Sequence, residues 1–84
     1  MHVTVISPAS ATFDGEAISV VAPAYDGQVG ILANHAPFMT LLGEGTLKIR
    51  TDSGERRFTV KGGFLQAVHN AVRVVAEQIT LEGN

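Results

Sequence analysis

The sequence predicts an all-β fold, a flattened β-sandwich or barrel without a substantial helix. Apolar and polar residues alternate strictly in residues 46–50 and again in residues 57–61, the period of strands with one buried and one solvated face. Turn-forming residues recur about every 8–12 positions, which is typical of sandwiches and barrels. Pro37 disfavours a helix in residues 36–42, the one stretch of ambiguous period.

Four strands are expected in the first part of the chain. Pro8 ends the first because it cannot donate to a strand ladder, and Gly15 ends the second. The third is apolar on both faces in part, which indicates a central strand. Pro23 and then Asp26-Gly27 turn the chain into the fourth. These strands are expected at residues 2–7, 11–14, 16–22 and 28–32.

The second part predicts two hairpins. Residues 52–55 form a turn-former cluster of hairpin length between the alternating runs 46–50 and 57–61. Strands at residues 64–68 and 72–76 flank a tight connection in which Asn70 is expected to take the left-handed conformation. Gly62-Gly63 is too short for a phosphate-binding loop, and paired glycines at a strand junction permit a bulge or a close strand crossing.

Length and composition limit the class of protein. A chain of 84 residues is expected to form a single domain, residues 1–84. The absence of cysteine excludes disulfides and thiolate zinc sites. No apolar run approaches the ~20 residues of a membrane span, and no signal-peptide pattern is present. We therefore expect a cytosolic chain that meets a membrane only through a partner.

The charge distribution is uneven along the chain. A formal net charge of −2 disfavours a nucleic-acid surface. All six basic residues lie at or after Lys48, whereas the first 47 residues carry only acidic charges. This pattern favours either an electrically two-sided domain between unlike partners or late strands whose exposed faces happen to be basic.

The sequence offers no convincing site for catalysis, metal or cofactor. His2, His35 and His69 share no metal-ligand spacing, and the serines lack the glycine-flanked elbow of a nucleophile. Small flattened β-barrels also serve as lipoyl or biotinyl carriers with the prosthetic group on a lysine at a hairpin tip. Lys48 and Lys61 are instead expected inside strands. The chain is predicted not to be an enzyme.

One segment reads Tyr25-Asp26-Gly27-Gln28-Val29-Gly30-Ile31-Leu32-Ala33-Asn34-His35-Ala36-Pro37. It closely resembles the hallmark loop in the N-terminal β-sandwich domain of the ε subunit of F-type rotary ATP synthases. Phe13-Asp14-Gly15-Glu16, Gly62-Gly63-Phe64 and Val72-Arg73-Val74-Val75-Ala76-Glu77 follow the family's order and spacing. Gly27 and Gly30 are expected to bracket a turn with unusual backbone angles or close approach, and Asn34 to take left-handed geometry.

Two positions and the length depart from the family pattern. Ala33 stands where the family usually has proline, and Gln28 where it commonly has an acidic residue. The typical member continues into a two-helix C-terminal domain, and that helical hairpin is absent from these 84 residues.

The resemblance implies a ten-stranded flattened sandwich in the central stalk of the synthase. Such a subunit has no catalytic role, binds the γ subunit and the c-ring, and helps to couple ion-driven rotation to ATP synthesis. It would be peripheral on the cytoplasmic side of a bacterial inner membrane. A generic β-sandwich interaction module and the carrier domain remain the alternatives.

The resemblance also assigns contact residues. Asp26, Gly27 and Gln28 are expected to touch the polar loops of the c-ring. The residues expected on the γ-facing side are Ser7, His35 and Thr40. Neighbouring Phe38, Met39 and Leu41 either pack in the core or form an exposed apolar patch at the γ interface; the sequence leaves both open.

Overall fold

The computed structural model describes residues 1–8, 11–34 and 36–82. Within these residues the chain forms eight strands and no helix, which confirms the predicted all-β class. The strands are β1 (His2–Ile6), β2 (Ala11–Glu16), β3 (Ser19–Ala24), β4 (Gly27–Leu32), β5 (Phe38–Leu41), β6 (Glu44–Thr51), β7 (Gly54–Val68) and β8 (Ala71–Leu81).

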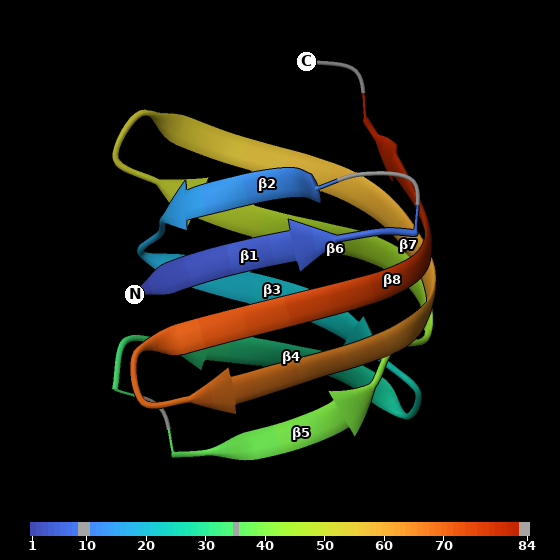
Figure 1. The fold of residues 1–84 in the computed structure, drawn as a ribbon, viewed down its shortest axis with the longest axis horizontal. Coiled ribbons are helices and arrows are strands. Elements are labelled where there is room, and N and C mark those ends of the chain that lie inside the picture. Colours follow the sequence, from blue (N-terminus) through green and yellow to red (C-terminus); the bar gives the residue numbers. More distant parts are fainter. Residues whose placement is uncertain (9–10, 35, 83–84) are drawn as a thin grey trace.

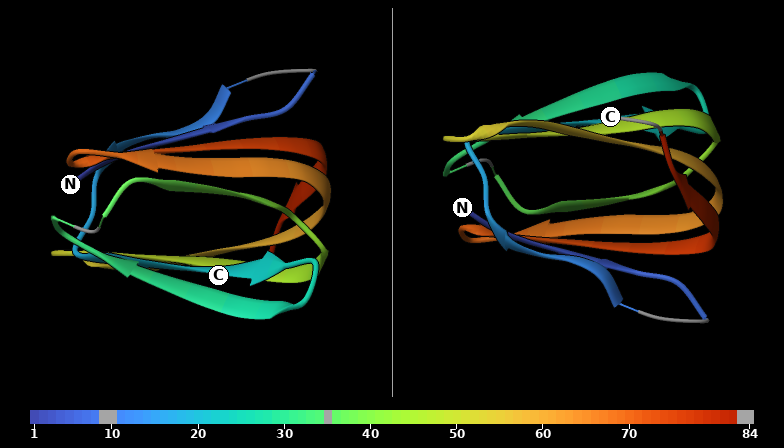
Figure 2. Two further views of the ribbon diagram at one scale, coloured as in Figure 1. Left: turned by 90° about the horizontal axis from the view of Figure 1, so that it is seen from below. Right: turned by 90° about the horizontal axis from the view of Figure 1, so that it is seen from above.

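The strands lie in two layers that face each other (Figures 1 and 2). Their hydrogen-bonded order is β2-β1-β8-β7-β6-β3-β4, with β5 on β7. We call the layer of β5, the end of β7, the start of β8, β1 and β2 the β1 layer. The β6 layer holds the end of β8, the start of β7, β6, β3 and β4. The sandwich is not a closed barrel, because no ladder joins β4 to β5 or β2 to β8 within the described residues.

Both long strands pass from one layer to the other, and the bend of β7 lies at Gly62-Gly63. These glycines have φ values of 72° and 105°, and a β-carbon on Gly63 would overlap the carbonyl oxygen of Val75. The register is the same on both sides, Lys61 opposite Gln78 and Gly63 opposite Ala76. Of the two alternatives left open by the sequence, the glycines therefore make the close crossing and not the bulge. Splitting β7 and β8 at the bend would give the ten strands expected; as continuous strands they make eight.

The core lies between the layers and follows the alternation read from the sequence. Phe58 and Leu47 are paired on β7 and β6 and are almost fully buried. Each layer contributes similar aliphatic side chains, so burial of apolar surface holds the layers together. The largest fully buried side chains are Phe58, Ile31, Leu47, Ile49, Leu65, Val3, Val5, Val20, Val60 and Val74.

The early strands differ from the expectation in their ends. β2 continues through Gly15, and the chain breaks between β2 and β3 at Ala17 and Ile18, where a strand was expected. The N–H of Ala17 donates to the carbonyl of Met1 at 2.9 Å, and that of Ile18 to Arg50 at 2.7 Å. The first bond is to the β1 layer and the second to the β6 layer, so the chain passes between the layers at Ala17 and Ile18. Pro23 lies inside β3 rather than ending it, and residues 38–41 of the ambiguous stretch are the strand β5.

The turns use left-handed backbone at particular residues. Gly27 and Gly54 each follow a two-residue turn, with φ values of 138° and 141°. Asn34 has the expected positive φ of 64°. Two expectations were wrong: His69 rather than Asn70 takes the positive φ, at 56°, and Gly30 has neither a positive φ nor a close neighbour.

Candidate partner-binding site

An apolar row crosses the outer face of the β1 layer. Strand register places Leu41 opposite Phe64, Phe64 opposite Val75, and Val75 opposite Ile6. The residues next to them, such as Leu65, Val74 and Val5, are fully buried, so alternation turns the row outward. Leu41 is 63% exposed, and Phe64, Val75 and Ile6 are half-buried. Four strands thus present one continuous line of apolar side chains.

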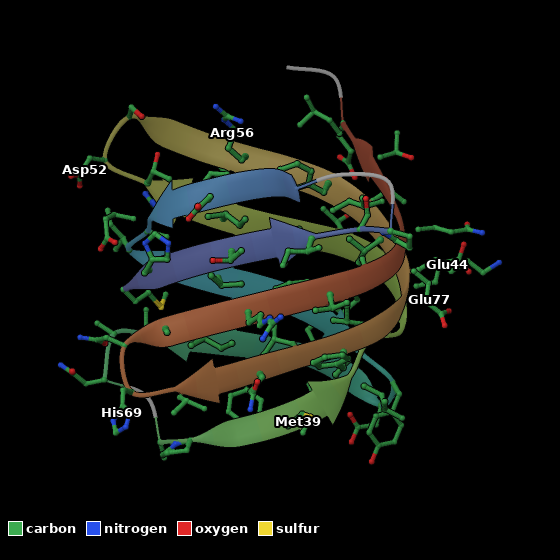
Figure 3. The ribbon with its side chains drawn as sticks, viewed as in Figure 1. Met39, Glu44, Asp52, Arg56, His69 and Glu77 are labelled. Carbon is green, nitrogen blue, oxygen red and sulfur yellow. The ribbon has the colours of Figure 1, made fainter. Side chains whose placement is uncertain are left out.

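Met39 extends the apolar row along β5. It is 62% exposed and opposite Gln66, and Figure 3 shows it on the outermost strand of this layer. Phe38, in contrast, is half-buried and packs against the core. The question left by the sequence is therefore answered differently for neighbouring residues: Met39 and Leu41 are exposed, and Phe38 points inward. We call the apolar row together with Met39 the apolar patch.

Two of the residues assigned to the γ-facing side lie at the ends of the apolar row. Ser7 follows Ile6 directly, and Thr40 precedes Leu41. The side chain of Thr40 is half-buried, and its hydroxyl donates to the carbonyl of Leu41 at 3.3 Å. It therefore shares the inward face of β5 with Phe38 instead of projecting beside Leu41. His35 lies outside the described residues.

The residues assigned to the c-ring form the tip of the β3–β4 hairpin. Asp26, Gly27 and Gln28 are all exposed, and Tyr25 beside them is 70% exposed. The tip is held in place because the N–H of Tyr25 donates to the carbonyl of Leu41 at 3.1 Å. The hairpin tip and the start of the apolar row are therefore fixed next to each other.

Exposed carboxylates gather toward the same end of the sandwich. Glu44 begins β6 and Glu77 lies where β8 bends, and Figure 3 shows both at the end where Figure 1 shows the β3–β4 turn. With Asp26 they place three exposed carboxylates at this end, where the exposed Lys61 lies opposite Glu44. The sequence alone did not indicate Glu44 and Glu77, because they are far from the hairpin along the chain and only the fold brings them to the same end.

The hallmark segment meets the β7–β8 turn at the opposite end. The N–H of Asn34 donates to the side-chain oxygen of Asn70 at 2.7 Å. Asn34, Ala36, Pro37, His69 and Asn70 line a cavity of about 400 Å³ there. The side chain of Asn70 thus holds the backbone at Asn34 in place, while its neighbour His69 adopts the positive φ of the β7–β8 turn.

Charges on the outer face of the β6 layer are mixed. Lys48 and Arg57 are directly opposite each other, and Arg50 is opposite Glu55. The Nε of Arg57 lies 3.9 Å from a carboxylate oxygen of Glu55 and 3.7 Å from one of Glu82. Carboxylates are therefore interspersed among the basic residues of this face.

A histidine joins two carboxylates on the outer face of the β1 layer. Nδ1 of His2 lies 2.9 Å from Oε2 of Glu16, and its Nε2 is hydrogen-bonded to Asp14. These bonds, first to Glu16 and then to Asp14, raise the pKa of His2 above 6.5. The described residues contain no group of three or more histidines and carboxylates arranged to hold a metal. No helix among them could cross a membrane.

Comparison with known proteins gives one consistent family. A family model described as the β-sandwich domain of the ATP synthase delta/epsilon chain matches residues 1–82. The ATP synthase epsilon chain of Hyphomonas neptunium is 38% identical over 79 residues, 93% of this chain and 58% of the relative. That of Leptospira borgpetersenii is 38% identical over 82 residues, with coverages of 98% and 65%. That of Caulobacter vibrioides is 36% identical over 77 residues, with coverages of 92% and 90%.

Solved structures share the fold. A chain of the Euglena gracilis mitochondrial ATP synthase, solved with its OSCP, F1 and c-ring, superposes with a TM-score of 0.86 at 18% identity, over 94% of this chain and 51% of that one. A chain of the Tetrahymena thermophila mitochondrial ATP synthase central stalk and c-ring gives 0.78 at 19% identity, over 94% and 64%. The chain spans little more than half of several relatives and most of the Caulobacter one. With the family model matching nearly every residue, the chain belongs to the delta/epsilon β-sandwich family of ATP synthases.

Proposed function

We propose that the chain is a non-catalytic central-stalk subunit of an F-type ATP synthase, which binds the γ subunit and the c-ring and helps to couple ion-driven rotation to ATP synthesis. The observation that carries this proposal is the apolar patch on a chain of this family. Contiguous apolar side chains on the surface of a domain support a protein interface there.

The γ subunit is the proposed partner of the apolar patch. Ser7 and Thr40 lie at the ends of the apolar row, and Leu41 and Met39 are the most exposed members of the apolar patch. Burying one such side chain contributes about 1.5–3 kcal/mol. In this arrangement Thr40 acts by shaping β5, and the neighbouring Leu41 makes the contact.

The c-ring is the proposed partner of the hairpin tip. Asp26, Gly27 and Gln28 project beyond the sandwich and are anchored to β5 through Tyr25. A short anchored hairpin suits a contact that must hold its shape under load. The chain would thus be peripheral on the cytoplasmic side of a bacterial inner membrane, in contact with it only through the complex.

The carrier alternative is less well supported. A carrier needs a lysine at a hairpin tip. The two-residue tips here are Tyr25-Asp26, Asp52-Ser53 and His69-Asn70, whereas Lys48 and Lys61 lie within β6 and β7.

The test compares two glutamate substitutions by binding to the purified γ subunit of the source organism. Leu41→Glu places a charge in the apolar patch. Leu81→Glu is the matched control, because Leu81 is 58% exposed and lies at the end of β8 in the other layer. We expect Leu41→Glu to weaken γ binding at least about tenfold and Leu81→Glu to bind like the unchanged chain. Both should keep the unchanged unfolding midpoint.

A pull-down from solubilised membranes of the same organism completes the test. Recovery of γ, c and catalytic-head subunits with the tagged chain is the expected result. A folded bait that recovers none of them, or a Leu41→Glu variant that binds γ normally, would overturn the proposal.

A further inference from the structure

The two open sides of the sandwich differ in charge. On one side, the edge strand β2 carries Asp14 and Glu16, and Glu82 follows the end of β8. On the other side lie the edge strands β4 and β5, and residues 27–43 contain no Asp, Glu, Lys or Arg. Charged residues on an edge strand discourage pairing with other chains. The β4–β5 side lacks this protection.

The free polar groups of β4 follow from the register. Ala24 and Gly27 close a two-residue turn, so they form a hydrogen-bonded pair, and the next pair, Pro23 with Gln28, does not exchange backbone bonds. The direction of the Pro23 carbonyl supports this pattern. It points away from β4 and accepts from the N–H of Gly43 at 2.9 Å. By the same alternation, the residues whose N–H and C=O groups point out from the edge are Gln28, Gly30 and Leu32.

Gly30 lies at the centre of this edge without an internal reason to be glycine. Its φ is not in the left-handed region, and no atom lies within 4 Å of the position of a β-carbon. A glycine inside a strand often marks the close approach of another backbone. Leu32, two residues on, is 64% exposed. The unprotected edge and the unexplained glycine are independent observations that point to the same strand.

The edge of β5 is partly occupied within the chain. The carbonyl of Leu41 points away from β7 and accepts from the N–H of Tyr25 at 3.1 Å. β4 is therefore the more available of the two edges. Figure 2 (left) looks onto this side, where β4 and β5 lie in front with their outer edges uncovered.

We propose that an extended, uncharged segment of the γ subunit adds a strand to β4, so that the β6 layer continues into the partner. This inference rests on the proposed function. Met39 and Leu41 of the apolar patch are on β5, on the same side of the sandwich as β4. One partner can therefore cover the outer face of the β1 layer and reach the β4 edge. Backbone hydrogen bonds supply affinity in such strand addition, and the absence of charge on β4 selects an uncharged segment.

The test removes one outward N–H. Gly30→Pro deletes the central donor of the edge and leaves the β3–β4 ladder intact, since proline is tolerated on an edge strand when its nitrogen faces solvent. Gly30→Ala is the matched control, because it keeps the N–H and its β-carbon enters open space. We expect Gly30→Pro to weaken binding to purified γ at least about tenfold. Gly30→Ala should lose less binding than Gly30→Pro, because it keeps the N–H and adds only a β-carbon where the partner strand approaches.

A second measurement needs no substitution. Amide hydrogen exchange of the unchanged chain should be fast at Gln28, Gly30 and Leu32 and should slow at all three when γ is added. If γ binds through Leu41 while Gly30→Pro binds normally and these amides stay in fast exchange, the strand addition is wrong and the proposed function survives. If γ does not bind at all, both fail. Protection that rises with the concentration of the chain alone would assign the edge to a second copy and overturn the proposal.

Discussion

Gly63 and Val75 lie so close across β7 and β8 that a β-carbon on residue 63 would overlap the carbonyl oxygen of residue 75. The φ of Gly63, 105°, is one that other residues rarely adopt. This contact lies where the long strands pass between the layers, so one position combines a steric demand with a conformational one.

Gly63→Ala should therefore destabilise the fold by about 2–4 kcal/mol, from backbone strain and from the displacement of β8. Urea unfolding measures the loss. Gly30→Ala is the control, since its β-carbon meets nothing within 4 Å, and it should change stability by no more than about 0.5 kcal/mol. Equal effects at the two glycines would contradict the importance of the crossing.

Phe58→Ala should cost about 3–5 kcal/mol, because the ring is almost fully buried between the layers and its removal leaves a cavity. The comparison is Thr80→Ala on the exposed face of β8, which should cost about 0.5 kcal/mol or less. Thermal or urea unfolding distinguishes them. A small loss for Phe58→Ala would mean that the core closes around the missing ring.

His2 should titrate above pH 6.5, because the carboxylates of Glu16 and Asp14 favour its charged form. A pKa raised in the folded state gives stability that is fully present below pH 6.5 and is lost as the pH rises through the folded pKa. NMR titration of the ring protons gives the pKa. The difference in unfolding free energy between the unchanged chain and His2→Gln should shrink as the pH rises above 6.5. A pKa at or below 6.5 would show that the two bonds do not form in solution.

Gln28→Lys should weaken docking on the c-ring while the fold stays intact, because it adds a positive charge to an exposed tip that carries Asp26. Binding of the chain to a detergent-solubilised c-ring without γ isolates this contact. Ser53→Lys, at the tip of the β6–β7 hairpin, is the control and should bind normally. Unchanged c-ring binding by Gln28→Lys would show that the β3–β4 tip is not the c-ring contact.

The β6–β7 hairpin could be predicted because its evidence is local. Alternation in residues 46–50 and 57–61 and the turn at Asp52-Ser53 lie within one short segment. The continuity of β7 could not be predicted, since paired glycines such as Gly62-Gly63 are typical of a strand junction and the crossing of β8 is not visible in the sequence. The choice of His69 over Asn70 for left-handed geometry likewise depends on a distant partner, the N–H of Asn34.

The segments that contribute to the candidate site could be predicted from the sequence. The surface that they form together could not. The hallmark loop indicated the family and the hairpin tip, and Leu41 was a candidate without a decision between core and surface. The apolar row needs the registers of four strands at once. Ile6, Phe64 and Val75 are ordinary strand residues until the fold aligns them with Leu41.

The passage of β7 and β8 through both layers has a mechanical consequence. In a sandwich made of two separate sheets, a sideways force on one sheet reaches the other only through side-chain packing. Here β7 and β8 are each continuous from one sheet into the other, and backbone hydrogen bonds join them to each other on both sides of the bend. The two sheets are therefore linked through the main chain. A torque applied at the apolar patch would therefore reach the β6 layer through the main chain of β7 and β8 as well as through side-chain packing.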